Sequence, residues 1–157
     1  MTRIKEDDTT TLDGILAALY DSISGPAGVE RDGERFRSLF LEEGARLVRT
    51  SIAEDGAASV VVMGVDEYLR AANEYFQENA FYEREIARRV ARFGHVTHAL
   101  STYESRRDEA EAEPFARGVN SIQLFHDGRR YRVVTVFWDF ERPDNPVPAE
   151  YLPSPEA

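Results

Sequence analysis

The chain has 157 residues, of which 42% are hydrophobic and none is cysteine, and its formal net charge is −10. This length suits one domain that buries a substantial core, and the lack of cysteine excludes disulfides, thiolate nucleophiles and cysteine-ligated metal centres. The negative field repels polyphosphates, so nucleic acid is not an expected partner.

Membrane and cofactor signals are missing from the sequence. Its longest apolar runs, such as residues 59–63, are far shorter than the roughly 20 residues that cross a bilayer. Residues 1–8 turn acidic where an export signal needs an apolar stretch, so we expect a cytoplasmic protein with no membrane partner. No phosphate loop, dinucleotide fingerprint, nucleophile elbow or His-Glu-x-x-His helix occurs, and we expect no cofactor.

Three segments carry apolar residues at helical spacing. The first spans residues 12–23, with threonine N-cap candidates at 9–11 before it and Gly25-Pro26 to end it. A second, shorter helix is predicted over about residues 31–41. A third is predicted over about residues 65–79.

The remaining segments have the pattern of strands. Residues 45–52 and 58–63 are rich in β-branched side chains and form a predicted hairpin around a turn at 54–56. Four longer antiparallel strands are predicted at residues 81–93, 95–107, 117–126 and 129–141. Five of the seven prolines lie after residue 142. We therefore predict one domain over residues 1–142 and an extended or disordered tail over residues 143–157.

The order of these elements and three stretches near the C-terminus resemble the nuclear transport factor 2-like (SnoaL-like) superfamily. The stretches are FGHVTHALSTYE at 93–104, NSIQLFHDG at 120–128 and YRVVTVFWD at 131–139. The likeness covers about residues 11–141 and implies an α+β cone, with a curved antiparallel sheet of about six strands wrapped around three helices. The superfamily contains isomerases, dehydratases, cyclases, hydrolases and non-enzymatic binding domains, so the fold does not name a reaction. This sequence has no full set of residues that matches the acid and base groups of the ketosteroid isomerase and scytalone dehydratase branches.

Counting along the predicted strands sorts their side chains into two faces. If Asp127-Gly128 is a two-residue turn, Asn120 shares a face with Thr135, Phe137 and Asp139. If Thr102 lies opposite Asn120, then His98 and Glu104 join that face, which we expect to line a pocket under the helices. One extra residue in either connection would reverse the assignment, because side chains alternate along a strand.

His98 and Asp139 are the candidate catalytic residues. A histidine exchanges protons near neutral pH, and a carboxyl deep in an apolar cup has a raised pKa that suits a general acid or base. Their alternative interpretations are a histidine hydrogen-bonded in the core and an aspartate paired with a nearby arginine at the sheet margin. His95 and His98 point to opposite faces of one strand, so no metal site is predicted.

The remaining predictions concern a ligand and a second copy of the chain. The residues expected to line the pocket are Tyr20, Phe36, Phe40, Tyr68, Thr102, Glu104, Asn120, Thr135 and Phe137. The other sheet face carries no formal charge and predicts a homodimer interface. The residues assigned to it are Ala99, Ser101, Tyr103, Ser121, Gln123, Phe125, Val134, Val136 and Trp138.

Two functions fit these observations, and whether the chain is an enzyme stays open. One is a protein that binds a small apolar molecule, as a cofactor-free acid–base isomerase, dehydratase or cyclase acting on a small apolar or cyclic substrate. The other is a non-catalytic dimeric module that binds a peptide or accessory partner and has a filled cone. A cavity of several hundred cubic ångströms that reaches His98 or Asp139 would favour the first.

Overall fold

The computed structural model describes residues 6–155, so residues 1–5, on which part of the expectation about export rests, lie outside the described residues. The elements follow the predicted order, with helices before a long meander. They are the 3-10 helix Glu6–Thr9, α1 (Leu12–Asp21), α2 (Gly33–Ser38), β1 (Arg46–Ile52), β2 (Ala58–Met63), α3 (Val65–Glu78), β3 (Tyr82–Phe93), β4 (Val96–Arg106), β5 (Ala116–His126), β6 (Tyr131–Phe140) and the 3-10 helix Ala149–Tyr151.

Helix α1 forms where the threonine cap meets the apolar stripe. The Thr11 hydroxyl accepts a hydrogen bond from the Gly14 N–H at 2.9 Å, which satisfies one of the free donors of the first turn. The stripe then turns inward, and Ile15 and Leu16 are completely buried. The predicted cap and the predicted buried face of this helix are both confirmed.

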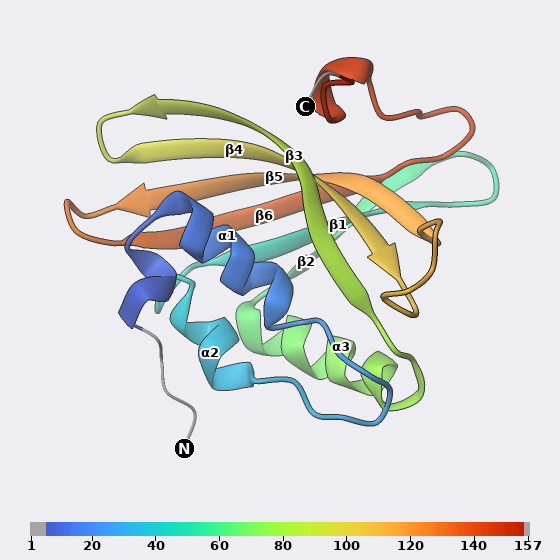
Figure 1. Ribbon diagram of the computed structural model, residues 1–157, viewed down its shortest axis with the longest axis horizontal. Coiled ribbons are helices and arrows are strands. Elements are labelled where there is room, and N and C mark those ends of the chain that lie inside the picture. Colours follow the sequence, from blue (N-terminus) through green and yellow to red (C-terminus); the bar gives the residue numbers. More distant parts are fainter. Residues whose placement is uncertain (1–5, 156–157) are drawn as a thin grey trace.

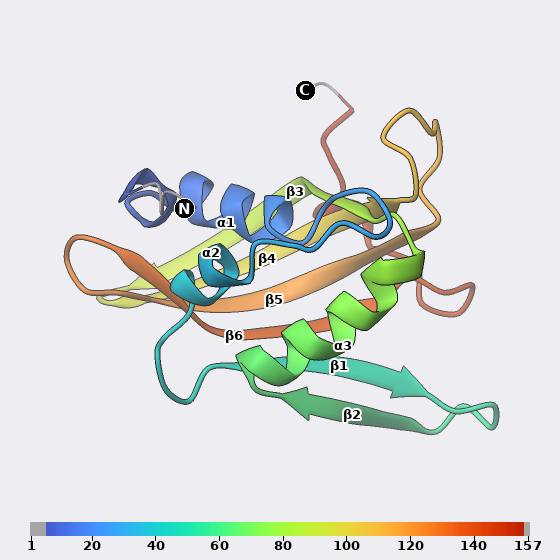
Figure 2. The ribbon, with the colours of Figure 1, turned by 90° about the horizontal axis from the view of Figure 1, so that it is seen from below.

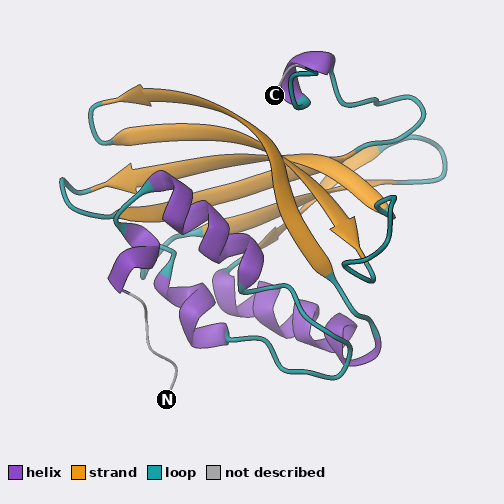
Figure 3. Ribbon diagram, viewed as in Figure 1, coloured by secondary structure: helices purple, strands orange, loops and turns teal. Residues whose placement is uncertain are grey.

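The six strands form one strongly curved sheet in the order β2-β1-β6-β5-β4-β3 (Figures 1 and 3). Neighbouring strands are antiparallel except for β1 and β6, which pair in parallel. The helices lie on the inner side of the sheet, where their apolar faces and the inward side chains of β4, β5 and β6 form the core (Figure 2). The predicted α+β cone with three helices is confirmed.

The predicted pairing of β5 with β6 is wrong in two respects. His126 pairs with Tyr131, so the connection has four residues, and the Asp127 carboxylate accepts from the N–H groups of Arg129 and Arg130 at 2.7 and 2.8 Å. A β-bulge then places Val133 opposite Leu124 but Thr135 opposite Gln123. After this extra residue, each side chain of β6 points to the opposite sheet face from the one predicted.

This bulge changes which residues of β6 face inward. Asn120 lies opposite Trp138, so Val136 and Trp138 belong to the inner face with Asn120. Three residues that we assigned to the pocket face lie on the outer face instead: Thr135, Phe137 and Asp139. Two that we assigned to the dimer face, Val136 and Trp138, contribute to the core.

The predicted pairing of β4 with β5 is wrong by one residue. Asn120 lies opposite Ser101, and Thr102 lies opposite Val119. The inner face of β4 therefore carries Ala99, Ser101 and Tyr103, all of them buried. His98, Thr102 and Glu104 lie on the outer face, because side chains alternate along the strand.

The described part of the Pro-rich tail, residues 143–155, crosses the outer side of the sheet. Its short 3-10 helix contacts β3 and β4, and the Thr102 hydroxyl donates to the Tyr151 carbonyl at 2.5 Å. Arg89 of β3 forms an ion pair with Glu150 at 3.8 Å. The tail therefore covers part of the outer face of β3 and β4.

Candidate functional site

A cavity of about 180 Å³ lies between the helices and the inner face of the sheet. Most of its wall is apolar or aromatic, and Glu83 is its one formally charged residue. The lining residues are Leu19, Tyr20, Ile23, Phe36, Leu47, Tyr68, Phe81, Glu83, Tyr103, Ser105, Phe115, Ala116, Asn120, Val136, Trp138 and Phe140. The cavity is thus an apolar chamber with a single carboxyl group.

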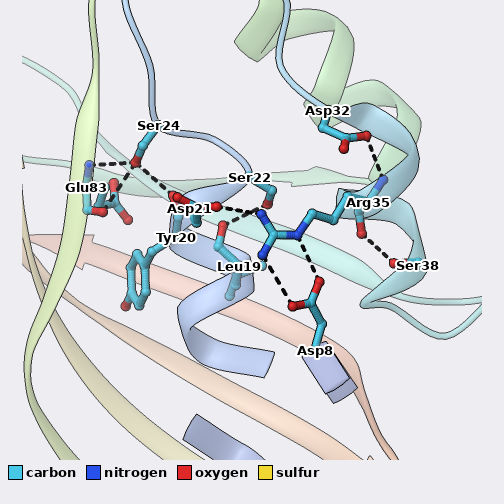
Figure 4. Close-up of polar contacts among 10 residues, drawn as sticks. All are labelled: Asp8, Leu19, Tyr20, Asp21, Ser22, Ser24, Asp32, Arg35, Ser38 and Glu83. Atoms are coloured by element: carbon cyan, nitrogen blue, oxygen red, sulfur yellow. Dashed lines mark hydrogen bonds and ion pairs between the residues drawn. The ribbon is translucent and has the colours of Figure 1, made fainter. Parts of the chain in front are cut away.

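Strand β3 and helix α1 together hold Glu83 in the wall. Glu83 lies opposite Ser105, whose hydroxyl donates to its carboxylate at 3.2 Å. The Ser24 hydroxyl, just after α1, accepts from the Glu83 N–H at 3.0 Å and donates to the Tyr20 carbonyl at 2.8 Å (Figure 4). The backbone of Glu83 is therefore tied directly to the end of α1.

The electrostatics of the cavity favour the protonated forms of its acids. Burial raises the pKa of Glu83 to about 7, although hydrogen bonds with Ser105 and Asn120 act in the opposite direction. Burial, and then the charge of Glu83, raise the pKa of Tyr20, Tyr68 and Tyr103 above the ordinary value for tyrosine. Glu83 is the group in this cavity whose proton can be exchanged near neutral pH.

Tyr20 belongs to a chain of hydrogen bonds whose directions follow from its ends. The Asn120 amide donates to the Tyr20 hydroxyl at 2.9 Å, and the Ser101 hydroxyl donates to the Glu85 carboxylate at 2.5 Å. Tyr20 and Ser101 are 2.6 Å apart, and because the Ser101 proton is committed to Glu85, Tyr20 donates to Ser101. The Tyr20 hydroxyl is therefore fully used within the protein.

The hydroxyls of Tyr68 and Tyr103 differ from that of Tyr20. Within residues 6–155 neither hydroxyl has a hydrogen-bond partner in the protein. In the same range, every fully buried side-chain N or O atom does have a hydrogen-bond partner. The two hydroxyl oxygens must therefore keep accessible surface, and both tyrosines line the cavity. They are available to donate hydrogen bonds to a molecule inside it.

A second depression adjoins the cavity behind Tyr20 and Glu83, which line both. It is a polar groove of about 740 Å³ whose acidic residues outnumber its arginines. Arg88 in its wall is paired with Glu85 at 2.7 Å and with Asp13 at 2.5 Å. The groove brings solvent close to the carboxyl end of the cavity.

Four of the residues predicted to line the pocket do so: Tyr20, Phe36, Tyr68 and Asn120. Phe40 is buried in the core, with its ring 4.9 Å from that of Phe36. The remaining predicted lining residues lie on the outer sheet face and are not part of the cavity wall. They are Thr102, Glu104, Thr135 and Phe137.

The two candidate catalytic residues are also outside the cavity. His98 is half-buried on the outer face, with its Nε2 2.8 Å from the Ser121 hydroxyl. Asp139 receives hydrogen bonds from Arg142 at 2.6 Å and from Thr50 at 2.6 Å. Its pairing with Arg142 is the main reason why its pKa falls to about 2. The prediction of a raised pKa for Asp139 is therefore wrong. Neither His98 nor Asp139 lines the cavity, so the cavity does not support a catalytic role for either residue.

Glu104 is held in an ion-pair cluster on the same outer face. Burial alone would raise its pKa, but Arg106 at 2.7 Å and Arg84 at 3.4 Å outweigh burial and lower the pKa. Arg84 and Arg88, both on β3, also form ion pairs with carboxylates.

Sequence reasoning missed Glu83, Tyr103 and Trp138 as lining residues. Tyr103 and Trp138 were assigned to the opposite face because of the register errors in β4 and β6. Glu83 lies in a strand rich in alternating charges, a pattern that usually marks a solvated surface. No local signal separates this glutamate from its neighbours, since α1, β4 and β5, which surround it, come from distant parts of the chain.

Residues 6–155 contain no group of three or more side chains placed to hold a metal ion. They also contain no helix with the length and hydropathy needed to cross a membrane.

No protein-family model and no curated protein matches the chain. Solved structures do share its architecture. A proposed calcium/calmodulin-dependent protein kinase type II association domain from Thiobacillus denitrificans matches with a TM-score of 0.61, 11% identity and coverage of 84% of this chain and 96% of that chain. A proposed dehydratase of the NTF2-like family from Streptomyces avermitilis matches with a TM-score of 0.56, 13% identity and coverage of 84% and 99%.

A proposed ketosteroid isomerase from Parabacteroides distasonis matches with a TM-score of 0.55, 9% identity and coverage of 91% of this chain and 95% of that chain. At these identities the likeness concerns the fold. The chain has the nuclear transport factor 2-like fold, as the sequence resemblance indicated, and the reaction has to be argued from the cavity itself.

Proposed function

We propose that the cavity binds a small apolar molecule and that Glu83 transfers a proton to or from it, as in a cofactor-free isomerase or dehydratase. The observation that carries this proposal is a carboxyl group with a pKa of about 7 in the wall of an apolar cavity. A general acid–base group works best when its pKa lies near the operating pH. Two proteins with this fold, the proposed dehydratase and the proposed ketosteroid isomerase, have names in keeping with this class of reaction.

The simplest reaction that these groups perform is isomerisation next to a carbonyl. The ionised Glu83 carboxylate takes a proton from the carbon beside the carbonyl, and the C–H electron pair moves toward the carbonyl oxygen. The Tyr68 and Tyr103 hydroxyls supply hydrogen bonds to that oxygen as its negative charge develops. In a β,γ-unsaturated ketone the resulting anion is a dienolate. The protonated Glu83 then returns the proton to the γ-carbon as the carbonyl re-forms, so the α,β-unsaturated isomer is produced without a co-reactant.

Exchange of carbon-bound hydrogen for deuterium tests this proposal without knowledge of the natural substrate. Cyclic ketones and enones are incubated with the protein in deuterated water, and deuterium incorporation is followed by NMR. We expect Glu83→Gln to lower the rate at least about a hundredfold, the range that general-base removal usually costs. The rate of the unaltered protein should rise with pH and level off above about pH 7, because the base acts in its ionised form.

Glu104→Gln is the matched control, because Glu104 is a strand carboxylate on the outer face. It should leave the exchange rate unchanged. Equal rates for Glu83→Gln and the unaltered protein on every exchanging compound would rule out Glu83 as the base.

A second function is favoured by the outer face of the sheet, and we propose homodimer formation there. Register places four exposed apolar side chains on that face: Phe93 (88% exposed), Val96 (60%), Phe125 (41%) and Phe137 (43%). Phe93, Val96 and Phe125 are paired neighbours across β3, β4 and β5, and exposed apolar patches of this kind mark interaction surfaces. Only Phe125 was among the residues first assigned to the dimer face, because the strand register differs from the predicted one.

A further inference from the structure

The volume of the cavity limits the size of its occupant. Drug-sized ligands occupy sites of roughly 300–1,000 Å³, whereas an engineered apolar cavity of about 150 Å³ binds benzene. At about 180 Å³, the cavity beside Glu83 therefore has room for one six-membered ring with small substituents. A fused four-ring skeleton would have to extend out of this cavity, past Tyr20 and Glu83, into the adjoining groove.

The walls resist enlargement because their aromatic rings support one another. The Phe36 and Tyr68 rings stack with their centroids 5.3 Å apart, and Tyr68 meets Trp138 edge-on at 6.3 Å. Phe36 also contacts the buried Phe40. Moving one wall ring displaces the next in a close-packed interior, so the volume is a property of the whole cluster.

The charges of the wall limit the ionic state of the occupant. None of the lining residues is lysine, arginine or histidine, so an anion would lose its hydration without gaining a positive partner. Glu83, once ionised, would repel it further. Below about pH 7 the protonated Glu83 offers no negative partner to a cation either, which argues for a neutral occupant.

The free hydroxyls of Tyr68 and Tyr103 define the polar group of the occupant. Both are donors without an acceptor in the described part of the protein, whereas Tyr20 is already committed to Ser101. Both hydroxyl oxygens keep accessible surface, so an occupant that covers them loses hydrogen bonds to solvent unless it offers an acceptor. An oxygen atom of the occupant that accepts hydrogen bonds would be that acceptor.

We propose that the cavity takes a neutral, single-ring compound with one hydrogen-bond-accepting oxygen, of the class of cyclic ketones and enones. This inference rests on the proposed function of the Glu83 cavity and specifies its substrate class. Size, lack of charge and the acceptor oxygen each follow from a separate feature: the volume, the wall composition and the two free hydroxyls.

Calorimetric titration at pH 6 with five probes tests the class. The probes are cyclohex-2-enone, cyclohexanone, benzoate, cyclohexylammonium and a four-ring steroid ketone. We expect the first two to bind at least tenfold more tightly than the other three. Benzoate differs from the ketones mainly in its charge, so it tests the limit on charge. The steroid ketone differs mainly in its size, so it tests the limit on size.

Four variants tie binding to the cavity. Tyr68→Phe and Tyr103→Phe should each weaken binding of cyclohex-2-enone about three- to tenfold, the usual effect of one hydrogen bond. Ala116→Leu should abolish binding by filling the cavity that Ala116 lines. Tyr75→Phe is the control, since the Tyr75 hydroxyl accepts from Arg107 at 2.9 Å and is not part of the cavity wall.

The outcomes separate this inference from the proposed function. Tightest binding of the steroid, the anion or the ammonium compound would overturn the neutral single-ring class, and so would binding of none of the probes. An NMR titration of the Glu83 carboxyl is the independent measurement. If Glu83 titrates near pH 7 while the probe order is wrong, only the substrate class fails. If it titrates as an ordinary surface glutamate, the proposed function fails with it.

Discussion

At the scale of single residues, Glu83 links function to stability. Its pKa is about 7 in the folded protein, compared with an ordinary value of 4.5. Between these values the unfolded chain has lost the proton that the folded chain keeps. The free energy of unfolding therefore falls as the pH rises from 4.5 to 7, by about 3 kcal/mol for this shift, and changes little from this source above pH 7.

Glu83→Gln removes this pH dependence while keeping the side chain nearly the same size. We expect the difference in unfolding free energy between the variant and the unaltered protein to move in favour of the variant by about 3 kcal/mol from pH 4.5 to pH 7.5. Urea titrations across that range measure it.

Glu104→Gln provides a control of opposite sign, because the pKa of Glu104 is lowered by Arg106 and Arg84 against the effect of burial. Its ion pairs stabilise the protein above the unfolded pKa and lose their effect as the pH falls through the folded pKa. The variant should therefore lose stability relative to the unaltered protein as the pH rises. A pH-independent difference for Glu83→Gln would show that Glu83 has an ordinary pKa.

At the scale of elements, the connection between α1 and α2 depends on one buried cation. Arg31 is 6% exposed and donates to four backbone carbonyls, those of Ile23, Gly25, Pro26 and Val29, at 2.7–3.1 Å. Its guanidinium also lies 4.3 Å from the centre of the Phe76 ring on α3. One side chain thus satisfies the polar groups of a whole loop and joins it to a helix.

Arg31→Met should destabilise the protein by about 3 kcal/mol, since several buried carbonyls would lose their donors. Chemical denaturation at neutral pH measures the loss. Arg37→Met is the control, because Arg37 and its partner Asp66 are 52% and 72% exposed and such pairs contribute roughly 0–1 kcal/mol. Similar losses of unfolding free energy for both variants would mean that the buried hydrogen bonds of Arg31 stabilise the protein no more than an exposed ion pair does.

Elements were predicted well from the sequence, and their relative register was not. Hydrophobic periodicity located α1, α3 and the six strands within about two residues of their observed ends, since that pattern is local. The bulge on β6 and the four-residue turn at 127–130 depend on how two strands fit the curvature of the sheet. These two features decided that Trp138 faces the cavity and Asp139 does not.

At the scale of the whole molecule, the proposed dimer has a direct test. Analytical ultracentrifugation at micromolar concentration should show a homodimer, and Phe137→Glu should convert it to a monomer by placing a charge in the apolar outer face. Val29→Glu is the control, because Val29 is a similarly exposed apolar residue in the loop between α1 and α2. A monomeric unaltered protein would exclude the interface.

The sequence by itself determined the order of the elements and the apolar stripe of α1, because these follow from periodicity along the chain. The cone fold was implied by the resemblance to the nuclear transport factor 2-like superfamily. The sequence also identified Tyr20, Phe36 and Tyr68 as lining residues, since these helix residues did not depend on strand register. Asn120 lines the cavity as well, although the strand pairing from which it was predicted is wrong. Only the tertiary structure decided the position of the carboxyl group. Glu83 becomes an acid–base candidate because α1 packs over β3 and withdraws it from water, and desolvation by distant segments leaves no trace in local sequence.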